Sequence, residues 1–195
     1  RERDMRPTLM TNGIACTRDL LKALVEAGLN DVAFHVDLTE ERKGFATEKD
    51  LNKVRLEYIE RARGLPVAVI FNTTVYKDNF SEIPDLIRFF RENADVVGMA
   101  SFQLQADTGR GALRKREQVI SLDTVCEQVE KGAGSQISFE SVRIGHPRCH
   151  RYGLTFQVNG KTYDFWDDSE FFAAFMKVTR DLELVRTSTF GAVVG

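Results

Sequence analysis

Residues 67–72 read VAVIFN, a run of β-branched, apolar and aromatic side chains of strand length. Similar runs occupy residues 8–11, 32–37 and 96–102, which read TLMT, VAFHVD and VVGMASF. None of them alternates strictly between apolar and polar side chains. We therefore expect each run to be covered on both faces, as the strands of a parallel sheet are.

The segments between these runs carry helix signals. Thr17 is placed to cap a helix that stops at Gly28, and Thr47 with Asp50 resembles a capping box. Ser81 is expected to cap a third helix. Strand and helix therefore repeat every thirty residues or so, as in right-handed βαβ units. Either an open α/β sheet or part of a (β/α) barrel would produce this pattern.

The chain changes character after the fourth run. Residues 103–118 are polar and basic, and we expect a long loop whose arginines meet a phosphate or carboxylate, or are simply solvated. Asn159-Gly160 lies between residues 154–158 and 161–165, a strong signal for a hairpin. A last amphipathic helix is expected over residues 169–182. We therefore predict a partial barrel over residues 1–120 and an α+β extension over residues 121–195.

Composition excludes several classes of function. The chain has 195 residues, of which 43% are hydrophobic, and Lys+Arg 27 nearly balances Asp+Glu 29. This balance gives no field that would attract nucleic acid, and no apolar run is long enough to span a bilayer. Three cysteines are too few for a disulfide framework, which favours a reducing cytoplasm. The common phosphate-loop, zinc-protease and serine-hydrolase motifs do not occur.

Polar side chains follow each of the four runs. Ligands bind at the carboxyl ends of strands in parallel α/β sheets, so these side chains predict a binding site along one rim. Within this set, alternation places His35 and Asp37 on the same face. His35 is then either a satisfied core histidine or a functional one. The candidate residues are Asn12, His35, Asp37, Asn72, Thr74 and Gln103.

A second candidate site is the stretch of residues 146–150, which reads HPRCH. Imidazole and thiolate ligands suit zinc or an iron–sulfur cluster. Only Cys16 and Cys126 remain elsewhere, and no pair of cysteines has C-x-x-C spacing. A semi-exposed loop cysteine is the alternative interpretation of Cys149.

Several of these elements together resemble a known family. They are TNG at residues 11–13, FNTTV at 71–75, SFQ at 101–103, TGR at 108–110, and the His-Pro-x-Cys element at 146–149. In this order they resemble the later part of radical S-adenosylmethionine (radical SAM) iron–sulfur enzymes. The branch includes archaeal tetraether lipid synthases and methyltransferase-like proteins that act on pterin or lipid substrates.

The resemblance implies a partial (β/α) barrel of the TIM type, to which this chain supplies the third to sixth strands. In that family a C-x-x-x-C-x-x-C loop binds a [4Fe–4S] cluster, and one electron from a donor such as ferredoxin or flavodoxin cleaves S-adenosylmethionine. The resulting 5′-deoxyadenosyl radical activates a C–H bond of a small-molecule or lipid substrate for methylation or C–C bond formation. The cluster loop is expected upstream of Arg1, so we expect this fragment alone to be inactive.

The resemblance also implies roles for the rim. Asn12 matches the polar end of the third strand, and His35 with Asp37 matches the position that meets the cofactor's ribose or carboxylate. Asn72 and Thr74 match the strand end near the adenosine, whereas Gln103 matches a position nearer to substrate.

Cys149 matches a ligand of an auxiliary iron–sulfur cluster. Relatives carry a further cysteine just before it, whereas residues 141–145 read SVRIG here. Two rival interpretations are a metal-independent α/β small-molecule binding domain and a non-catalytic interaction module.

Overall fold

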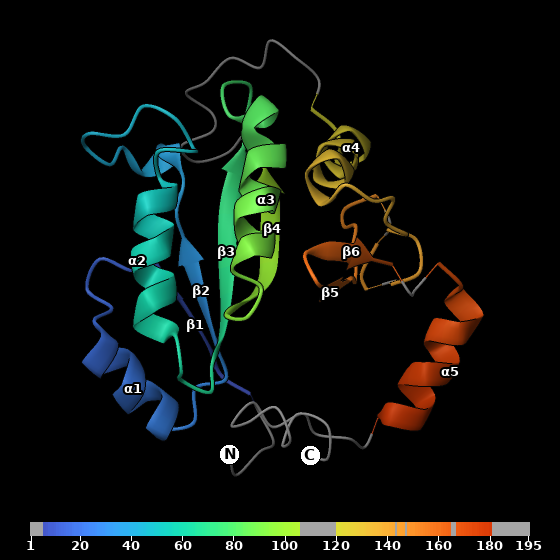
Figure 1. Ribbon diagram of the computed structural model, residues 1–195, viewed down its shortest axis with the longest axis horizontal. Coiled ribbons are helices and arrows are strands. Elements are labelled where there is room, and N and C mark those ends of the chain that lie inside the picture. The colour runs from blue at the N-terminus through green and yellow to red at the C-terminus, as the bar shows by residue number, and fades with distance from the viewer. Residues whose placement is uncertain (1–5, 106–119, 143, 147, 165–166, 181–195) are drawn as a thin grey trace. The chain divides into compact units, whose positions relative to one another are not determined.

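The computed structural model describes residues 6–105, 120–142, 144–146, 148–164 and 167–180 (Figure 1). It confirms an α/β chain with a parallel four-stranded sheet and a small antiparallel hairpin. The basic loop arginines and the Thr-Gly-Arg element lie outside the described residues. The elements follow the order β1 (Thr8–Thr11), α1 (Arg18–Glu26), β2 (Asp31–His35), η1 (Leu38–Glu40), α2 (Asn52–Ala62), β3 (Ala68–Val75), η2 (Phe80–Glu82), α3 (Ile83–Glu92), β4 (Val97–Leu104), α4 (Leu122–Ala133), β5 (Phe156–Val158), β6 (Lys161–Tyr163) and α5 (Ser169–Thr179).

The chain divides into two compact units. The first contains residues 6–74 and 93–103 and therefore nearly all of the parallel sheet. The second contains residues 75–92 and the described residues between 104 and 180. Among the described residues, no helix is both long and apolar enough to cross a membrane.

The sheet has the order β1-β2-β3-β4, so each strand lies beside the next one along the chain. Thr8 pairs with Asp31 at the start of β2, and Val32 pairs with Val69 of β3, both in parallel register. Sequential order is what the wall of a (β/α) barrel has. Four strands form one wall and not a closed barrel, so the barrel stays a prediction.

Several strand boundaries differ from the prediction, and the fourth strand runs to Leu104 instead of residue 102. The third strand continues to Val75 instead of stopping at residue 72, and the second stops at His35, before Asp37. Asp37 leaves the strand because its carboxylate accepts a hydrogen bond from the backbone N–H of Thr39 and caps η1. The aspartate that looked like a strand residue is therefore the first residue of the following turn.

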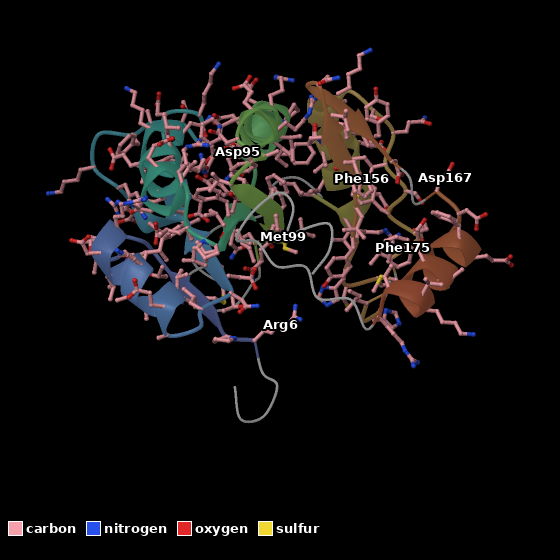
Figure 2. All side chains as sticks on the ribbon, turned by 60° about the horizontal axis from the view of Figure 1, so that its bottom comes forward. Arg6, Asp95, Met99, Phe156, Asp167 and Phe175 are labelled. Carbon is pink, nitrogen blue, oxygen red and sulfur yellow. The ribbon has the colours of Figure 1, made fainter. Side chains whose placement is uncertain are left out.

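An aromatic cluster defines the two faces of the sheet. The ring of Phe34 lies 4.8 Å from Tyr58 of α2 and 6.0 Å from Phe71 of β3, and all three are buried. Because side chains alternate along a strand, His35 and Asn72 point to the opposite side. We call that side the open face. Its apolar members include Met10, which is 70% exposed. Met99, labelled in Figure 2, is 49% exposed.

The expected capping residues have mixed outcomes. Thr17 caps α1 by accepting from the N–H of Leu20, as predicted. Thr47 and Asp50 exchange the two hydrogen bonds of a capping box at 3.1 and 3.0 Å, although regular helix begins only at Asn52. The prediction for Ser81 is wrong. Ser81 lies inside the 3₁₀ helix η2, which runs directly into α3 and so leaves no extended cap position.

The second unit is organised by α3 and α4. Ser121 forms a capping box with Thr124 at the start of α4, and Gly134 ends the helix in the left-handed region. Arg91 of α3 donates to the carbonyl oxygens of Gly132 and Gly160 at 3.1 and 2.6 Å. A single guanidinium therefore joins both helices to the hairpin.

The hairpin forms as the sequence predicts. Asn159 and Gly160 have φ of 50° and 74°, the two positive values that a type I′ turn requires. Strands β5 and β6 pair antiparallel around them. Asp168 caps α5, which ends at Thr179, three residues before the expected end.

We predict that Gly132→Ala destabilises the protein by about 1–3 kcal/mol, despite alanine's higher helix propensity. A Cβ at Gly132 would lie 2.6 Å from the Cβ of Ile87 and 2.7 Å from the carbonyl oxygen of Pro84. Urea unfolding would measure the change. Glu127→Ala, at an exposed position of the same helix, is the control and should shift the free energy by less than about 0.5 kcal/mol. Equal effects of the two variants would contradict the close packing of α3 on α4.

Candidate functional site

Hydrogen-bonding side chains from three neighbouring strands meet at the carboxyl end of the sheet. His35 Nε2 lies 3.0 Å from Asp37 Oδ2, and Asn72 Nδ2 lies 3.3 Å from His35 Nδ1. Asn72 Nδ2 also donates to Gln103 Oε1 at 3.4 Å. We call these four residues the rim network. The structure thus brings together four of the six side chains that the sequence singled out.

Asp37 is the buried anchor of the rim network. Its side chain is fully buried, Oδ1 accepts from the N–H and hydroxyl of Thr39, and Oδ2 accepts from the N–H of Thr74 at 2.7 Å. Burial alone would raise the pKa of the Asp37 carboxyl. The hydrogen bonds from His35, Thr39 and Thr74 outweigh burial and hold that pKa well below its usual range. Asp37 is therefore an ionised, acceptor-only group at neutral pH.

His35 is partly exposed, with 31% of its side chain accessible. Its hydrogen bond to Asp37 raises the pKa of the imidazole, against the opposing effect of burial, and nearby Glu40 and Arg42 add smaller effects of opposite sign. Since the Asp37 carboxylate can only accept, Nε2 of His35 carries a proton in both charge states. Nδ1 is then the nitrogen that gains or loses a proton.

A buried ion pair holds the turn that carries Asp37. Glu48 and Arg55 are both 0% exposed, with Oε2 and Nη2 2.6 Å apart. The same Nη2 donates to the carbonyl oxygen of Val36 at 2.7 Å, and Glu48 Oε1 accepts from the N–H of Leu38 at 2.9 Å. The ion pair therefore holds Val36 and Leu38, the residues on either side of Asp37, by hydrogen bonds to their backbone.

Sequence reasoning missed this ion pair, although a signal was present. Leu51, Tyr58 and Ala62 form the apolar stripe of α2, and Arg55 lies within that stripe at helical spacing. A charged residue in a buried stripe requires a partner. The identity of that partner was not readable, because Glu48 lies before the helix begins.

Asn12 lies apart from the rim network in the part of the chain that the structure describes. Its Oδ1 accepts from the N–H of Ile14 at 3.2 Å, and its carbonyl oxygen accepts from Tyr58 and Arg42. The next residue, Gly13, has φ of 78°, and a Cβ there would lie 2.2 Å from the Tyr58 ring. Gly13 therefore allows the loop after β1 to pass close to the Tyr58 ring of α2, where a larger residue would clash.

Two arginines enclose the same tyrosine, a feature that the sequence analysis did not find. The guanidinium carbons of Arg42 and Arg61 lie 5.7 and 4.6 Å from the centroid of the Tyr58 ring. Arg42 also pairs with Glu40 at 2.6 Å, and Arg61 donates to the carbonyl oxygens of Gly13 and Cys16. These contacts hold the loops after β1 and β2.

The cysteines do not assemble a metal site among the described residues. Burial raises the pKa of the Cys16 thiol, and Arg61 only partly opposes it; burial also raises the pKa of Cys126 to about 11. Cys149 is exposed, in a turn where its N–H donates to the carbonyl oxygen of His146 at 2.8 Å. No group of three or more potential metal ligands occurs in the described part of the chain. These residues therefore do not fit a complete iron–sulfur cluster.

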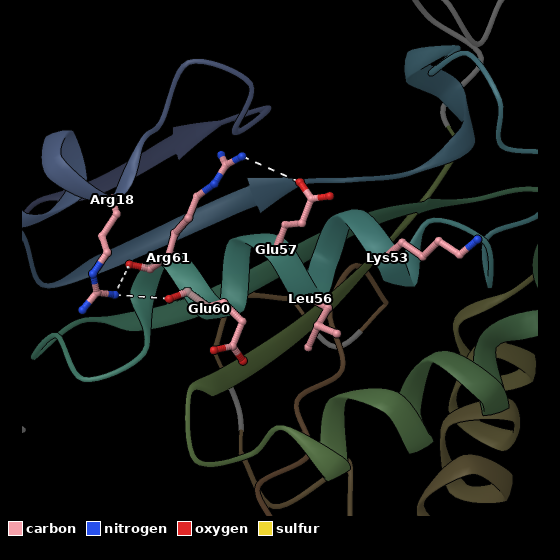
Figure 3. Close-up of a pocket in the computed structure, with 6 residues that line it drawn as sticks. All are labelled: Arg18, Lys53, Leu56, Glu57, Glu60 and Arg61. Carbon is pink, nitrogen blue, oxygen red and sulfur yellow. Dashed lines mark hydrogen bonds and ion pairs between the residues drawn. The ribbon is translucent and has the colours of Figure 1, made fainter.

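A shallow hollow of about 500 Å³ lies between α1 and α2 (Figure 3). Arg18 donates there to the carbonyl oxygens of Glu60, Arg61 and Arg63 at 2.9 to 3.2 Å, so it satisfies the carboxyl end of α2. The lining residues are Arg18, Lys53, Leu56, Glu57, Glu60 and Arg61. None of them belongs to the rim network. Arg61 pairs with Glu57 at 3.8 Å, and Glu60 pairs with Arg63 at 3.0 Å.

Comparison with known proteins gives one partial match. Over 106 residues the chain is 35% identical to a 7,8-dihydro-6-hydroxymethylpterin dimethyltransferase of Methanocaldococcus jannaschii. The match covers 52% of this chain and 21% of the relative, so the chain spans only a fraction of that protein's length. No family model and no solved structure matches.

We predict that the stabilising effect of His35 depends on pH. Its pKa is raised in the folded state, so its contribution is fully present below the unfolded value of about 6.5 and is lost as pH rises through the folded pKa. The gap in unfolding free energy between wild type and His35→Gln should therefore be larger at pH 6 than at pH 9. Urea unfolding at the two pH values measures it. An equal gap at both would show that His35 and Asp37 are not coupled.

Proposed function

We propose that the chain forms one wall of a radical SAM enzyme that methylates, or forms a C–C bond on, a small molecule. The observation that carries the proposal is its 35% identity to a pterin dimethyltransferase over about half of the chain. Two features support it. The strand order is sequential, as in a barrel wall, and polar groups gather at the carboxyl ends of β2, β3 and β4.

The open-face residues of the rim network have the donor set that a polar cofactor needs. Asn72 and Gln103 offer amide groups, and His35 offers a partly exposed imidazole. When bound, S-adenosylmethionine would supply a methyl group or a 5′-deoxyadenosyl radical. We propose that these three side chains orient it and the substrate.

Asp37 and Thr74 take different roles within this proposal. Asp37 is fully buried, with both carboxylate oxygens engaged, so we propose that it positions His35 and does not touch the ribose itself. The backbone N–H of Thr74 donates to Asp37 and ties the end of β3 to the turn after β2. Asn12 would contribute through the shape of its loop.

The proposal leaves the [4Fe–4S] cluster to other parts of a longer protein. The described cysteines do not fit it. The substrate would be pterin-like or a lipid, and an electron donor of the ferredoxin or flavodoxin type would serve the whole enzyme in the cytoplasm. Cys149 would join an auxiliary cluster only with ligands from outside the described residues.

Binding of S-adenosylmethionine to this chain tests the proposal. In ¹⁵N-labelled protein we expect saturable shifts of the amides in residues 35–39, 72–75 and 101–103. Asn72→Ala should weaken binding by about tenfold, because a hydrogen bond to a charged ligand is lost. Glu57→Gln, in the hollow between α1 and α2, is the matched control and should leave binding unchanged.

Two results would contradict the proposal. One is the absence of any shift at the strand ends at millimolar S-adenosylmethionine. The other is a shift confined to the hollow and sensitive to Glu57→Gln. If adenosine-free small molecules shifted the same strand ends instead, the chain would be a small-molecule binding domain of another class.

A further inference from the structure

The direction of the hydrogen bonds in the rim network follows from one fixed point. The Asp37 carboxylate only accepts, so the proton on His35 Nε2 must point at it. In neutral His35, Nδ1 is then a bare acceptor, and the group beside it at 3.3 Å must donate. Only Nδ2 of Asn72 can do so, which fixes the orientation of that amide.

The orientation of Asn72 in turn fixes that of Gln103. The two hydrogens of Asn72 Nδ2 are directed to His35 Nδ1 and to Gln103 Oε1. Asn72 Oδ1 and Gln103 Nε2 make no further hydrogen bond among the described residues. With neutral His35, the pair therefore displays an acceptor on Asn72 and a donor on Gln103.

Protonation of His35 reverses this arrangement. Nδ1 becomes a donor, and leaving Asn72 Nδ2 opposite it would place two donors 3.3 Å apart. Turning the Asn72 amide over removes the clash, because Oδ1 then accepts from His35. Gln103 must turn as well to donate to the same oxygen. The pair now displays a donor on Asn72 and an acceptor on Gln103.

We propose that Asn72 and Gln103 form a two-point recognition edge on the open face of the sheet, and that the proton on His35 sets its polarity. The ligand class that fits is a planar group carrying a donor beside an acceptor, as an amide or lactam edge does. Asn72 and Gln103 determine specificity, and His35 positions them. This inference rests on the rim geometry and does not depend on the radical SAM proposal.

The surroundings of His35 allow the switch to operate. Within the described part of the chain, the charged groups that act on it are Asp37 beside it and Glu40 and Arg42, which follow β2. Glu40 and Arg42 are paired with each other, so their effects largely cancel. The adjacent strands β1, β3 and β4 carry no charged residue within their bounds. Asn72, which lies beside Nδ1, is therefore the group whose orientation depends most directly on the proton there.

Side-chain amide NMR of the full chain tests this inference without any cofactor. As pH is raised through the titration of His35, the NH₂ resonances of Asn72 and Gln103 should shift together, with the same midpoint as the imidazole. The side chain of Gln157, which bonds to Thr162 in the hairpin, serves as an internal reference and should not move. If the NH₂ chemical shifts of Asn72 and Gln103 did not change as His35 titrates, the proposal would be wrong.

Asn72→Asp gives a second test that does not depend on those signals. A carboxylate cannot donate to Nδ1, so it favours doubly protonated His35 and should raise the imidazole pKa by about one unit, a tenfold change in proton affinity. Asn12→Asp adds the same charge at the end of β1, away from Nδ1, and should change that pKa much less. Equal shifts in the two variants would mean that His35 senses only charge and would refute the switch.

Recognition itself can be probed with δ-valerolactam and its N-methyl derivative, which lacks the donor. The lactam should shift the Asn72 and Gln103 side-chain amides at millimolar concentration, and the N-methyl form should not. Equal effects of the two compounds would rule out the two-point edge. Either result leaves the binding of S-adenosylmethionine to be decided separately.

Discussion

The buried ion pair between Glu48 and Arg55 is the constraint on which the candidate site depends. Taking two charges fully out of water costs several kcal/mol for each ion, and the attraction between them offsets this only when further hydrogen bonds complete both groups. Here one further bond goes from Arg55 to the Asn52 side chain, and others go to the backbone. Arg55 holds the carbonyl of Val36, and Glu48 holds the N–H of Leu38. The charge pair thus fixes the turn between them.

That turn determines what the rim can do chemically. Asp37 lies between Val36 and Leu38, whose backbone groups bond to the ion pair. Its carboxylate is therefore held where it accepts from His35, Thr39 and the backbone of Thr74. An ionised, buried carboxylate then sets the tautomer of His35, and His35 sets the orientation of Asn72. The buried ion pair of Glu48 and Arg55 therefore determines, through Asp37 and His35, how the Asn72 amide is oriented on the open face.

The sequence was sufficient for much of this architecture. Four apolar runs predicted the parallel strands, Thr17 predicted a helix start, and Asn159-Gly160 predicted the hairpin, because each signal is local. The strand-end rule also selected His35, Asp37, Asn72 and Gln103 before their contacts were known. Local signals failed at Ser81, where the chain enters α3 through a 3₁₀ turn.

The remaining features depend on contacts between residues far apart in sequence. Asp37 accepts locally from Thr39, but its second carboxylate oxygen is held by the backbone N–H of Thr74, which lies on the next strand of the sheet. The partner of Arg55 and the stacking of Arg42 and Arg61 on Tyr58 likewise require the folded loops. Residue type indicated which side chains could take part in binding. Tertiary contacts determine that Asp37 is buried while His35 is partly exposed.

Amide hydrogen exchange in a Glu48→Gln variant tests the dependence of the rim on the ion pair most directly. The substitution keeps the side-chain shape and removes its charge. Relative to the ladder amide of Val69, exchange at Leu38, Thr39 and Thr74 should accelerate together by at least about tenfold, because the turn loosens as one unit. If Leu38 alone accelerated while Thr39 and Thr74 kept their protection, Asp37 would be held independently of the ion pair, and this account of the site would be wrong.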